Sequence, residues 1–137
     1  MRFIRKLLSV REDGPREKDP LTLYYEYFAS ESQDMKERAR AIREKLSPLK
    51  SALSGAKITV NVSCTVLEEP RELLRRYADS KKTLEEITED RQTVLSRLDV
   101  VKDKNTLHVC VLFFNAAARK KELELKKQKP QPPSAGG

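Results

Sequence analysis

A chain of 137 residues is long enough for one domain and short for two. Hydrophobic residues make up 38% of the chain, so the core is lean, and a net charge of +7 favours anionic partners. One histidine, two cysteines and four scattered glycines exclude a four-ligand Cys/His zinc site within the chain, a P-loop and a dinucleotide-binding fingerprint, so we expect no cofactor and no small-molecule substrate.

The excess basic charge lies at the two ends of the chain. Residues 1–11 carry four cations and no acid, whereas residues 20–115 carry 16 cations and 15 acids. The basic excess returns after residue 115. Such arms contact anionic surfaces such as RNA, lipid or acidic protein. The cations expected to make these contacts are Arg2, Arg5, Lys6, Arg11, Arg119, Lys120, Lys121, Lys126, Lys127 and Lys129.

Residues 1–19 are predicted to form a basic amphipathic arm followed by a linker. Apolar side chains in residues 1–10 recur at helical spacing, opposite the arginines and lysine. This acid-free start fits an organelle-import sequence or a helix lying on a membrane surface, and it equally fits a helix packed on the main body. Residues 12–20 are polar and contain Gly14 and Pro15, as expected of a linker.

The domain predicted for residues 20–115 begins with an ambiguous aromatic run. Residues 21–28 hold three of the four tyrosines, and their pattern suits either a strand or a helix. Ser30 and Gln33 then match a capping box, which predicts the start of a helix.

Apolar residues at alternating spacings of four and three follow from Met35. Pro48 interrupts this pattern, and a proline inside a helix removes a hydrogen bond. We therefore expect one helix to end near Leu46 and a short one to run from Pro48 to Ser54.

Two segments are predicted to be strands. Residues 57–67 alternate between apolar and polar side chains, which is typical of a half-buried strand. Residues 106–114 are apolar on both faces and would form a second strand that needs cover on both sides. Two strands make a marginal sheet, so a third strand would come from residues 21–28 or from a partner chain.

Residues 70–101 are predicted to be helical, with a possible break near Ser80. Thr83 and Glu86 match a second capping box, so the region forms either one long helix or two helices with a kink between them. The apolar stripes of the helical regions form the expected helix-packing seam, which consists of Met35, Ile42, Leu46, Leu73, Tyr77, Leu84, Ile87, Val94 and Leu98. Residues 116–137 are predicted to form a basic helical tail that ends in a segment rich in proline and glycine.

The candidates for chemistry are few. His108 and Cys110 lie two apart, and in a strand they would share a face as a nucleophile and base do. Because no third residue supports them, we expect a core histidine beside a buried thiol and no enzyme. Cys64 and Cys110 are expected to be two buried free thiols.

The predicted fold class is α+β, with long heptad-patterned helices packed on a small two- or three-stranded sheet and basic helical extensions at both ends. The predicted function is that of a non-catalytic accessory subunit whose partners are other protein subunits of a large assembly. Residues 1–11 favour a mitochondrial complex of the respiratory-chain or ATP-synthase type, peripheral to the membrane, over a cytoplasmic location. The alternative is a ribosomal or other RNA-associated protein with its basic termini on phosphates.

Overall fold

All regular secondary structure is helical in the residues that the structure, a computed structural model, describes, which are 18–99 and 101–128. No strand occurs among these residues, so the predicted α+β fold with a sheet is wrong. The elements in chain order are α1 (Pro20–Phe28), α2 (Met35–Gly55), the 3-10 helix η1 (Val66–Glu68), α3 (Glu69–Asp79), α4 (Leu84–Ser96) and α5 (Lys104–Gln128).

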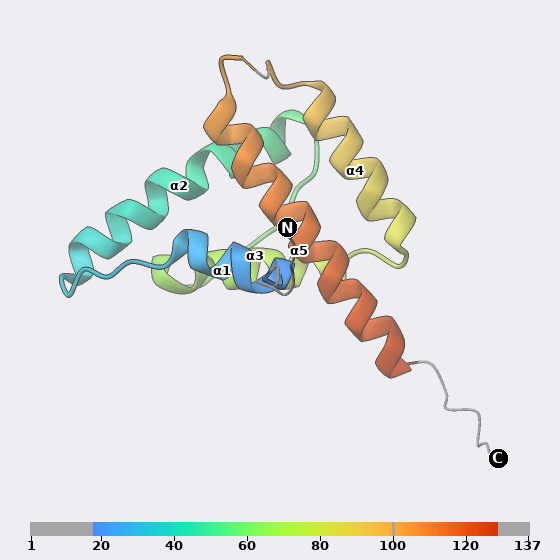
Figure 1. Cartoon of the computed structure of the whole chain (residues 1–137), viewed down its shortest axis with the longest axis horizontal. Helices are drawn as coiled ribbons and strands as arrows, with labels where there is room; N and C mark the ends of the chain where they lie inside the picture. The colour runs from blue at the N-terminus through green and yellow to red at the C-terminus, as the bar shows by residue number, and fades with distance from the viewer. Residues whose placement is uncertain (1–17, 100, 129–137) are drawn as a thin grey trace, which may run out of the picture.

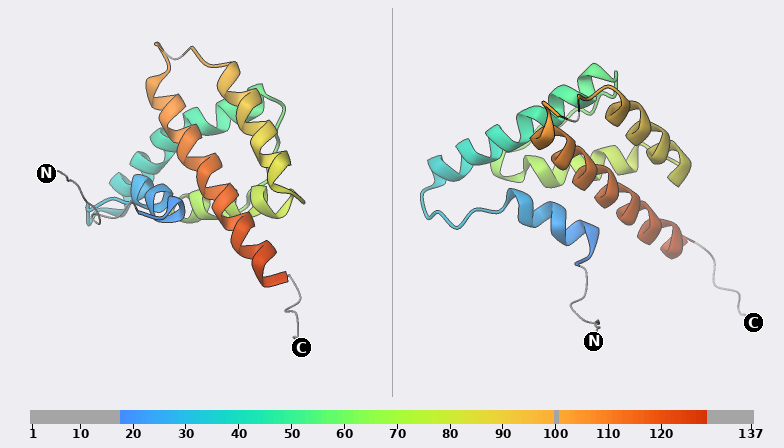
Figure 2. Two further views of the ribbon diagram at one scale, coloured as in Figure 1. Left: turned by 45° about the vertical axis from the view of Figure 1, so that its right-hand side comes forward. Right: turned by 45° about the horizontal axis from the view of Figure 1, so that its top comes forward.

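Helix α5 is the centre of the fold. It crosses the molecule diagonally and packs against α1, α2, α3 and α4, as Figures 1 and 2 show from three directions. Its last turns project beyond the body of the molecule at the lower right of Figure 1. The helix runs through residue 115, where the main domain was expected to end.

The strand predicted for residues 106–114 is the first half of α5. A short run that is apolar on all sides has no periodicity, and it suits a buried helix as well as a strand. Here four other helices pack against it, so it is buried on one side without a sheet. The buried residues of α5 fall within an arc of about 160° at about 100° per residue and are Val109, Cys110, Phe113, Phe114, Ala116, Ala117 and Lys121.

The strand predicted for residues 57–67 is also absent. Residues 58–63 form an irregular connection between α2 and η1, and η1 takes up the last residues of the predicted strand. The predicted alternation is nevertheless present, because Ile58, Val60 and Val62 pack against the core while Thr59 and Asn61 are exposed. The segment has the side-chain pattern of a strand but no neighbouring strand to pair with.

Helix α2 is continuous, contrary to the two helices predicted on either side of Pro48. Leu46, Leu49 and Leu53 are all buried, so packing on both sides of the proline outweighs the loss of one helical hydrogen bond. The capping box predicted at Ser30 does not form either. Asp34 caps α2 by accepting a hydrogen bond from Lys36 N at 3.1 Å.

The aromatic run of residues 21–28 is the helix α1, which resolves its ambiguity. Tyr24 and Phe28 are buried on one face of this helix. The hydroxyl of Tyr24 donates a hydrogen bond to the carbonyl oxygen of Pro70 at 2.7 Å, so α1 is tied to the start of α3.

Two helices occupy residues 69–96 and are separated by residues 80–83, at the break near Ser80 that the sequence leaves open. The capping box of Thr83 and Glu86 is confirmed, since each side chain bonds the backbone N–H of the other residue. Of the predicted helix-packing seam, Leu84 and Leu98 are half-buried and Met35 is 55% exposed. The buried members are Ile42, Leu46, Leu73, Tyr77, Ile87 and Val94.

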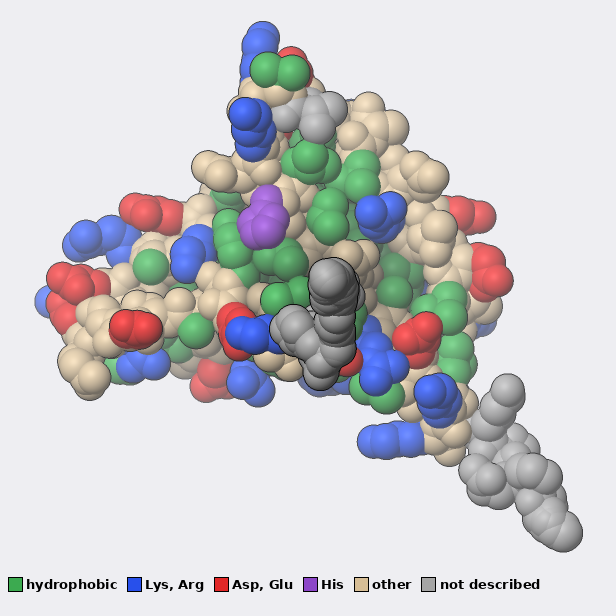
Figure 3. Space-filling model, in the orientation of Figure 1, with side chains coloured by type: hydrophobic (Ala, Val, Ile, Leu, Met, Phe, Trp, Pro, Cys, Tyr) green, Lys and Arg blue, Asp and Glu red, His purple; other side chains and the backbone are tan. Residues whose placement is uncertain are grey.

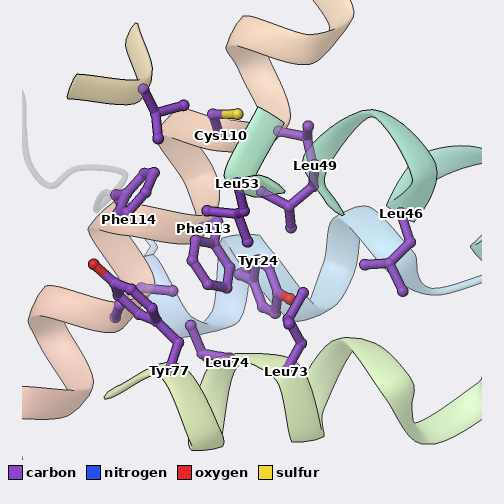
Figure 4. Close-up of a cluster of buried hydrophobic side chains, with 14 of the residues drawn as sticks. Tyr24, Leu46, Leu49, Leu53, Leu73, Leu74, Tyr77, Cys110, Phe113 and Phe114 are labelled. Carbon is purple, nitrogen blue, oxygen red and sulfur yellow. The ribbon is translucent and has the colours of Figure 1, made fainter. Parts of the chain in front are cut away.

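Phe113 of α5 lies at the middle of the aromatic core (Figure 4). Its ring centroid is 5.1 Å from that of Tyr77, 5.2 Å from that of Phe114 and 6.0 Å from that of Tyr24. The rings are inclined to one another, as aromatic pairs prefer. The core therefore joins α1, α3 and α5 through one aromatic cluster.

Candidate functional site

His108 and Cys110 do not form a catalytic pair. Residues two apart in a helix point about 200° apart around its axis, so the shared face expected in a strand is lost. His108 is exposed and meets the ring of Tyr27 edge-on at 5.4 Å, so it is not the core histidine that was predicted. Cys110 is fully buried, and burial raises its pKa to about 11, which leaves it an unreactive thiol.

The expectation that both cysteines are buried is wrong for Cys64, which is exposed, whereas Cys110 is buried. Both cysteines are free. Desolvation raises the pKa of the Cys64 thiol, and the nearby carboxylates of Glu69 and Glu72 raise it further. Among the described residues, no group of histidine, cysteine, aspartate and glutamate side chains is arranged to hold a metal ion.

The most enclosed polar cluster joins α3 to α4. The hydroxyl of Tyr77 donates to Asp90 Oδ2 at 2.6 Å, and Lys81 Nζ lies 2.8 Å from the same oxygen. Lys81 also lies over the Tyr77 ring, 5.4 Å from its centroid. Burial raises the pKa of Tyr77, and its hydrogen bond to Asp90 raises it further. The cluster holds α3 to α4 at their turn, and we interpret it as a clamp.

Tyr77→Phe is expected to lower the free energy of unfolding by about 1.5–3 kcal/mol, because it removes a hydrogen bond to a charged group. Because folding raises the pKa of Tyr77, its hydroxyl contributes fully below about pH 10, the value of an unfolded tyrosine, and loses its contribution as pH rises further. Urea unfolding at pH 7 and pH 11 should therefore show a smaller difference between variant and wild type at pH 11. Tyr25→Phe is the control, because its hydroxyl makes no hydrogen bond within the described residues; an equal loss in both variants would contradict the clamp.

The predicted basic contacts of the tail are partly engaged inside the molecule. Arg119 bonds Asp19 at 2.8 Å, Lys120 pairs with Glu124 at 3.3 Å, and Lys121 is buried beside the same glutamate. Lys126 and Lys127 are exposed at the projecting end of α5. The other predicted contacts, Arg2, Arg5, Lys6, Arg11 and Lys129, lie outside the described residues.

The face shown in Figure 3 carries no continuous basic surface. Its apolar side chains gather over α5 and between α5 and α4, and charges of both signs surround them. Within the described residues, no helix is both long and apolar enough to cross a membrane.

One candidate surface is the backbone of residues Thr59–Cys64. Within the described chain, none of these six residues makes a hydrogen bond through its N–H or C=O group to backbone or side chain. A hollow of about 410 Å³ runs beside the segment, between Thr59–Asn61 and α3. The residues of α3 and its end that line it are Arg75, Arg76, Asp79 and Ser80. Within the described residues these backbone groups are therefore left without a partner.

A second candidate surface is basic and lies on α2. This helix carries six cations and two acids, although residues 20–115 as a whole are nearly neutral. Exposed cations and hydroxyls recur along one line of α2, and we call this line the basic stripe; it consists of Lys36, Arg40, Arg43, Ser47, Lys50 and Ser54. Summing the charge over residues 20–115 hides this line, because the acids of other helices cancel it. A count by helix face would have found it, because the spacing is 4, 3, 4, 3 and 4.

Comparison with protein-family models, curated protein sequences and solved structures gives no match for this chain. Its function must therefore be argued from these two surfaces.

Proposed function

We propose that the chain is a non-catalytic structural subunit of a larger protein assembly. The observation that supports this is the unpaired backbone of Thr59–Cys64, beside a hollow that could receive an extended segment of another protein. Backbone hydrogen bonds along an unpaired strand give affinity in strand addition, and alternate side chains give specificity.

The composition of this segment supports strand addition. Residues 58–66 contain no charged residue, glycine or proline, and six of the nine are β-branched. β-branched residues favour strands, whereas connections between helices are usually rich in glycine, proline and polar residues. The residue types of 58–66 therefore suit a strand that pairs with another strand better than they suit a turn.

The packing of the segment also supports strand addition. Ile58, Val60 and Val62 hold one side of it against the core, so little further ordering is needed when a partner binds. Thr59 and Asn61 stay exposed on the outer side. An added strand would run along α3 and complete the pairing that this chain leaves open.

Asn61→Pro tests the proposal, because proline removes a backbone N–H and blocks pairing at that position. Asn61 is exposed and its N–H has no partner within the described residues, so the isolated chain should keep its fold. We expect the tagged wild type and Asn61→Ala to sediment with a large assembly in native extract, and Asn61→Pro to remain in the light fractions. Circular dichroism of the purified variants checks the fold.

Two results would overturn the proposal. One is a wild-type chain that sediments alone, and the other is an Asn61→Pro variant that enters the assembly as well as Asn61→Ala does. The same gradient after RNase treatment tests the alternative function, since an assembly that falls apart on digestion indicates an RNA-associated protein.

The compartment that we propose is the mitochondrion. This proposal comes from the pattern of residues 1–11, which lie outside the described residues, and fractionation of cells that express the tagged chain tests it.

A further inference from the structure

The basic stripe follows one side of α2 from the first turn of the helix to the last. Four of its six positions, from Arg43 onward, lie one residue after the buried positions Ile42, Leu46, Leu49 and Leu53, so this part of the stripe borders the packed side of the helix. From Lys36 to Ser54 it covers 18 residue steps, or about 27 Å at about 1.5 Å per residue. All of its side chains are exposed.

The stripe forms one wall of a groove. A hollow of about 580 Å³ lies between the first half of α2 and residues Thr65–Leu67, and a hollow of about 640 Å³ follows along the second half of α2 toward Glu69. Arg43 lines both hollows, so they meet at its side chain. Ser47, Ser51 and Ser54 place three hydroxyls along the second hollow.

The charge of the groove is strongly one-sided. Its one acid among the described residues is Glu69, and Lys50 pairs with it. Lys36, Arg40 and Arg43 make no ion pair within the described part of the chain. The two acids of α2 do not line either hollow, because Glu37 and Glu44 lie roughly 80–100° further around the helix from the middle of the stripe.

This pattern suits a regular polyanion. Arginine, lysine and serine side chains commonly contact the phosphate oxygens of nucleic acids, and such contacts do not distinguish one base sequence from another. Single-stranded nucleic acids are usually held by aromatic side chains that stack on bases, and no aromatic side chain lines the two hollows. A duplex is bound instead through its shape and its phosphate backbone.

We propose that the basic stripe of α2 binds the phosphate backbone of a nucleic-acid duplex without reading its sequence. This site is separate from the protein contact proposed at Thr59–Cys64, and it differs from the basic termini expected from the sequence. Lys36, Arg40 and Arg43 supply the charge, and the serine hydroxyls supply further donors.

The test is fluorescence anisotropy of the purified full chain with a 20-base-pair RNA duplex and with the DNA duplex of the same sequence. A variant carrying Lys36→Gln, Arg40→Gln and Arg43→Gln should bind the duplex on the order of 100-fold more weakly at 0.1 M salt. The slope of log affinity against log salt should fall by about 3, one for each lost phosphate contact. The RNA and DNA arms show which duplex is preferred.

The matched control carries Arg97→Gln, Lys102→Gln and Lys104→Gln, which remove the same charge from exposed positions that make no ion pair within the described residues. It should bind within about threefold of wild type. Equal weakening in both variants, weakening only in Lys126→Gln with Lys127→Gln, or no duplex binding by the wild type would each overturn the proposal. Binding to vesicles of anionic phospholipid without binding to either duplex would overturn it in favour of a membrane surface. Because the assay uses the purified chain, its outcome is independent of any assembly.

Discussion

Phe113→Ala is expected to lower the free energy of unfolding by about 3–5 kcal/mol. The Phe113 side chain is fully buried on α5, where its ring contacts Tyr24 of α1, Tyr77 of α3 and the adjacent Phe114. Truncation would remove the apolar surface of the ring and leave a cavity at the point where three helices meet. A small domain with a stability of about 5–15 kcal/mol would lose a large part of it.

Chemical unfolding followed by circular dichroism at 222 nm measures this loss. Leu125→Ala is the control, because Leu125 lies on the same helix and is 36% exposed. We expect its effect to stay below about 1 kcal/mol. If the two variants lost similar stability, Phe113 would not be at the centre of the core and the packing of α5 described above would be wrong.

Asn115→Pro is expected to cost about 3 kcal/mol or more, because proline inside a helix loses a backbone hydrogen bond and clashes with the preceding turn. Asn115 lies near the middle of α5 and its side chain is exposed, so the effect would come from the backbone and not from packing. The variant separates the observed fold from the predicted one. With a strand ending at residue 114, position 115 would begin a helix, where proline is well tolerated.

The same unfolding measurement serves for this variant, with Asn115→Ala as its control. Alanine favours a helix interior, so Asn115→Ala should be neutral or stabilise the protein by up to about 0.7 kcal/mol. A proline variant as stable as the alanine variant would show that α5 does not continue through this position.

The start of α4 and the buried sides of α2 and α4 could be predicted because their signals lie close together in the sequence. Apolar residues at spacings of four and three mark the buried side of α2 and α4, and Ile42, Ile87 and Val94 are buried as expected. The capping box at Thr83 needs only four consecutive residues, and it forms as predicted. The seam failed at Met35, which is more than half exposed, because the first turn of α2 extends past the helices that could cover it.

The two predicted strands failed for different reasons. Residues 106–114 are apolar on all sides, and only the packing of four other helices against one side of this run determines that it is a helix. Residues 58–62 do show the predicted alternation, which ends before the exposed Cys64, but a strand also needs a neighbour for its backbone, and this chain contains none among its described residues. Alternation of apolar and polar side chains indicates that one side of a segment is buried, but it does not indicate that the backbone pairs with another strand.

Of the two candidate surfaces, only the basic stripe can be recognised in the amino-acid sequence. The basic stripe was present in the spacing of Lys36, Arg40 and Arg43, but adding charges over residues 20–115 cancelled it against the acids of other helices. The candidate surface at Thr59–Cys64 could not be recognised from residue types. It consists of backbone N–H and C=O groups that make no hydrogen bond within the described residues, and only the tertiary structure shows this.

By itself the sequence determined the local features of this protein: the lean composition, the net charge of +7, the capped start of α4 and the apolar stripes that face the core. The tertiary structure decided what those features become. It showed that residues 106–114, apolar on all sides, belong to the central helix α5, and that Pro48 lies within a continuous α2. It also showed that residues 57–67, which have the pattern of a strand, pair with no other strand among the described residues. The physical reason is that propensity and periodicity act over a few residues, whereas burial and backbone pairing depend on segments that are distant in the sequence.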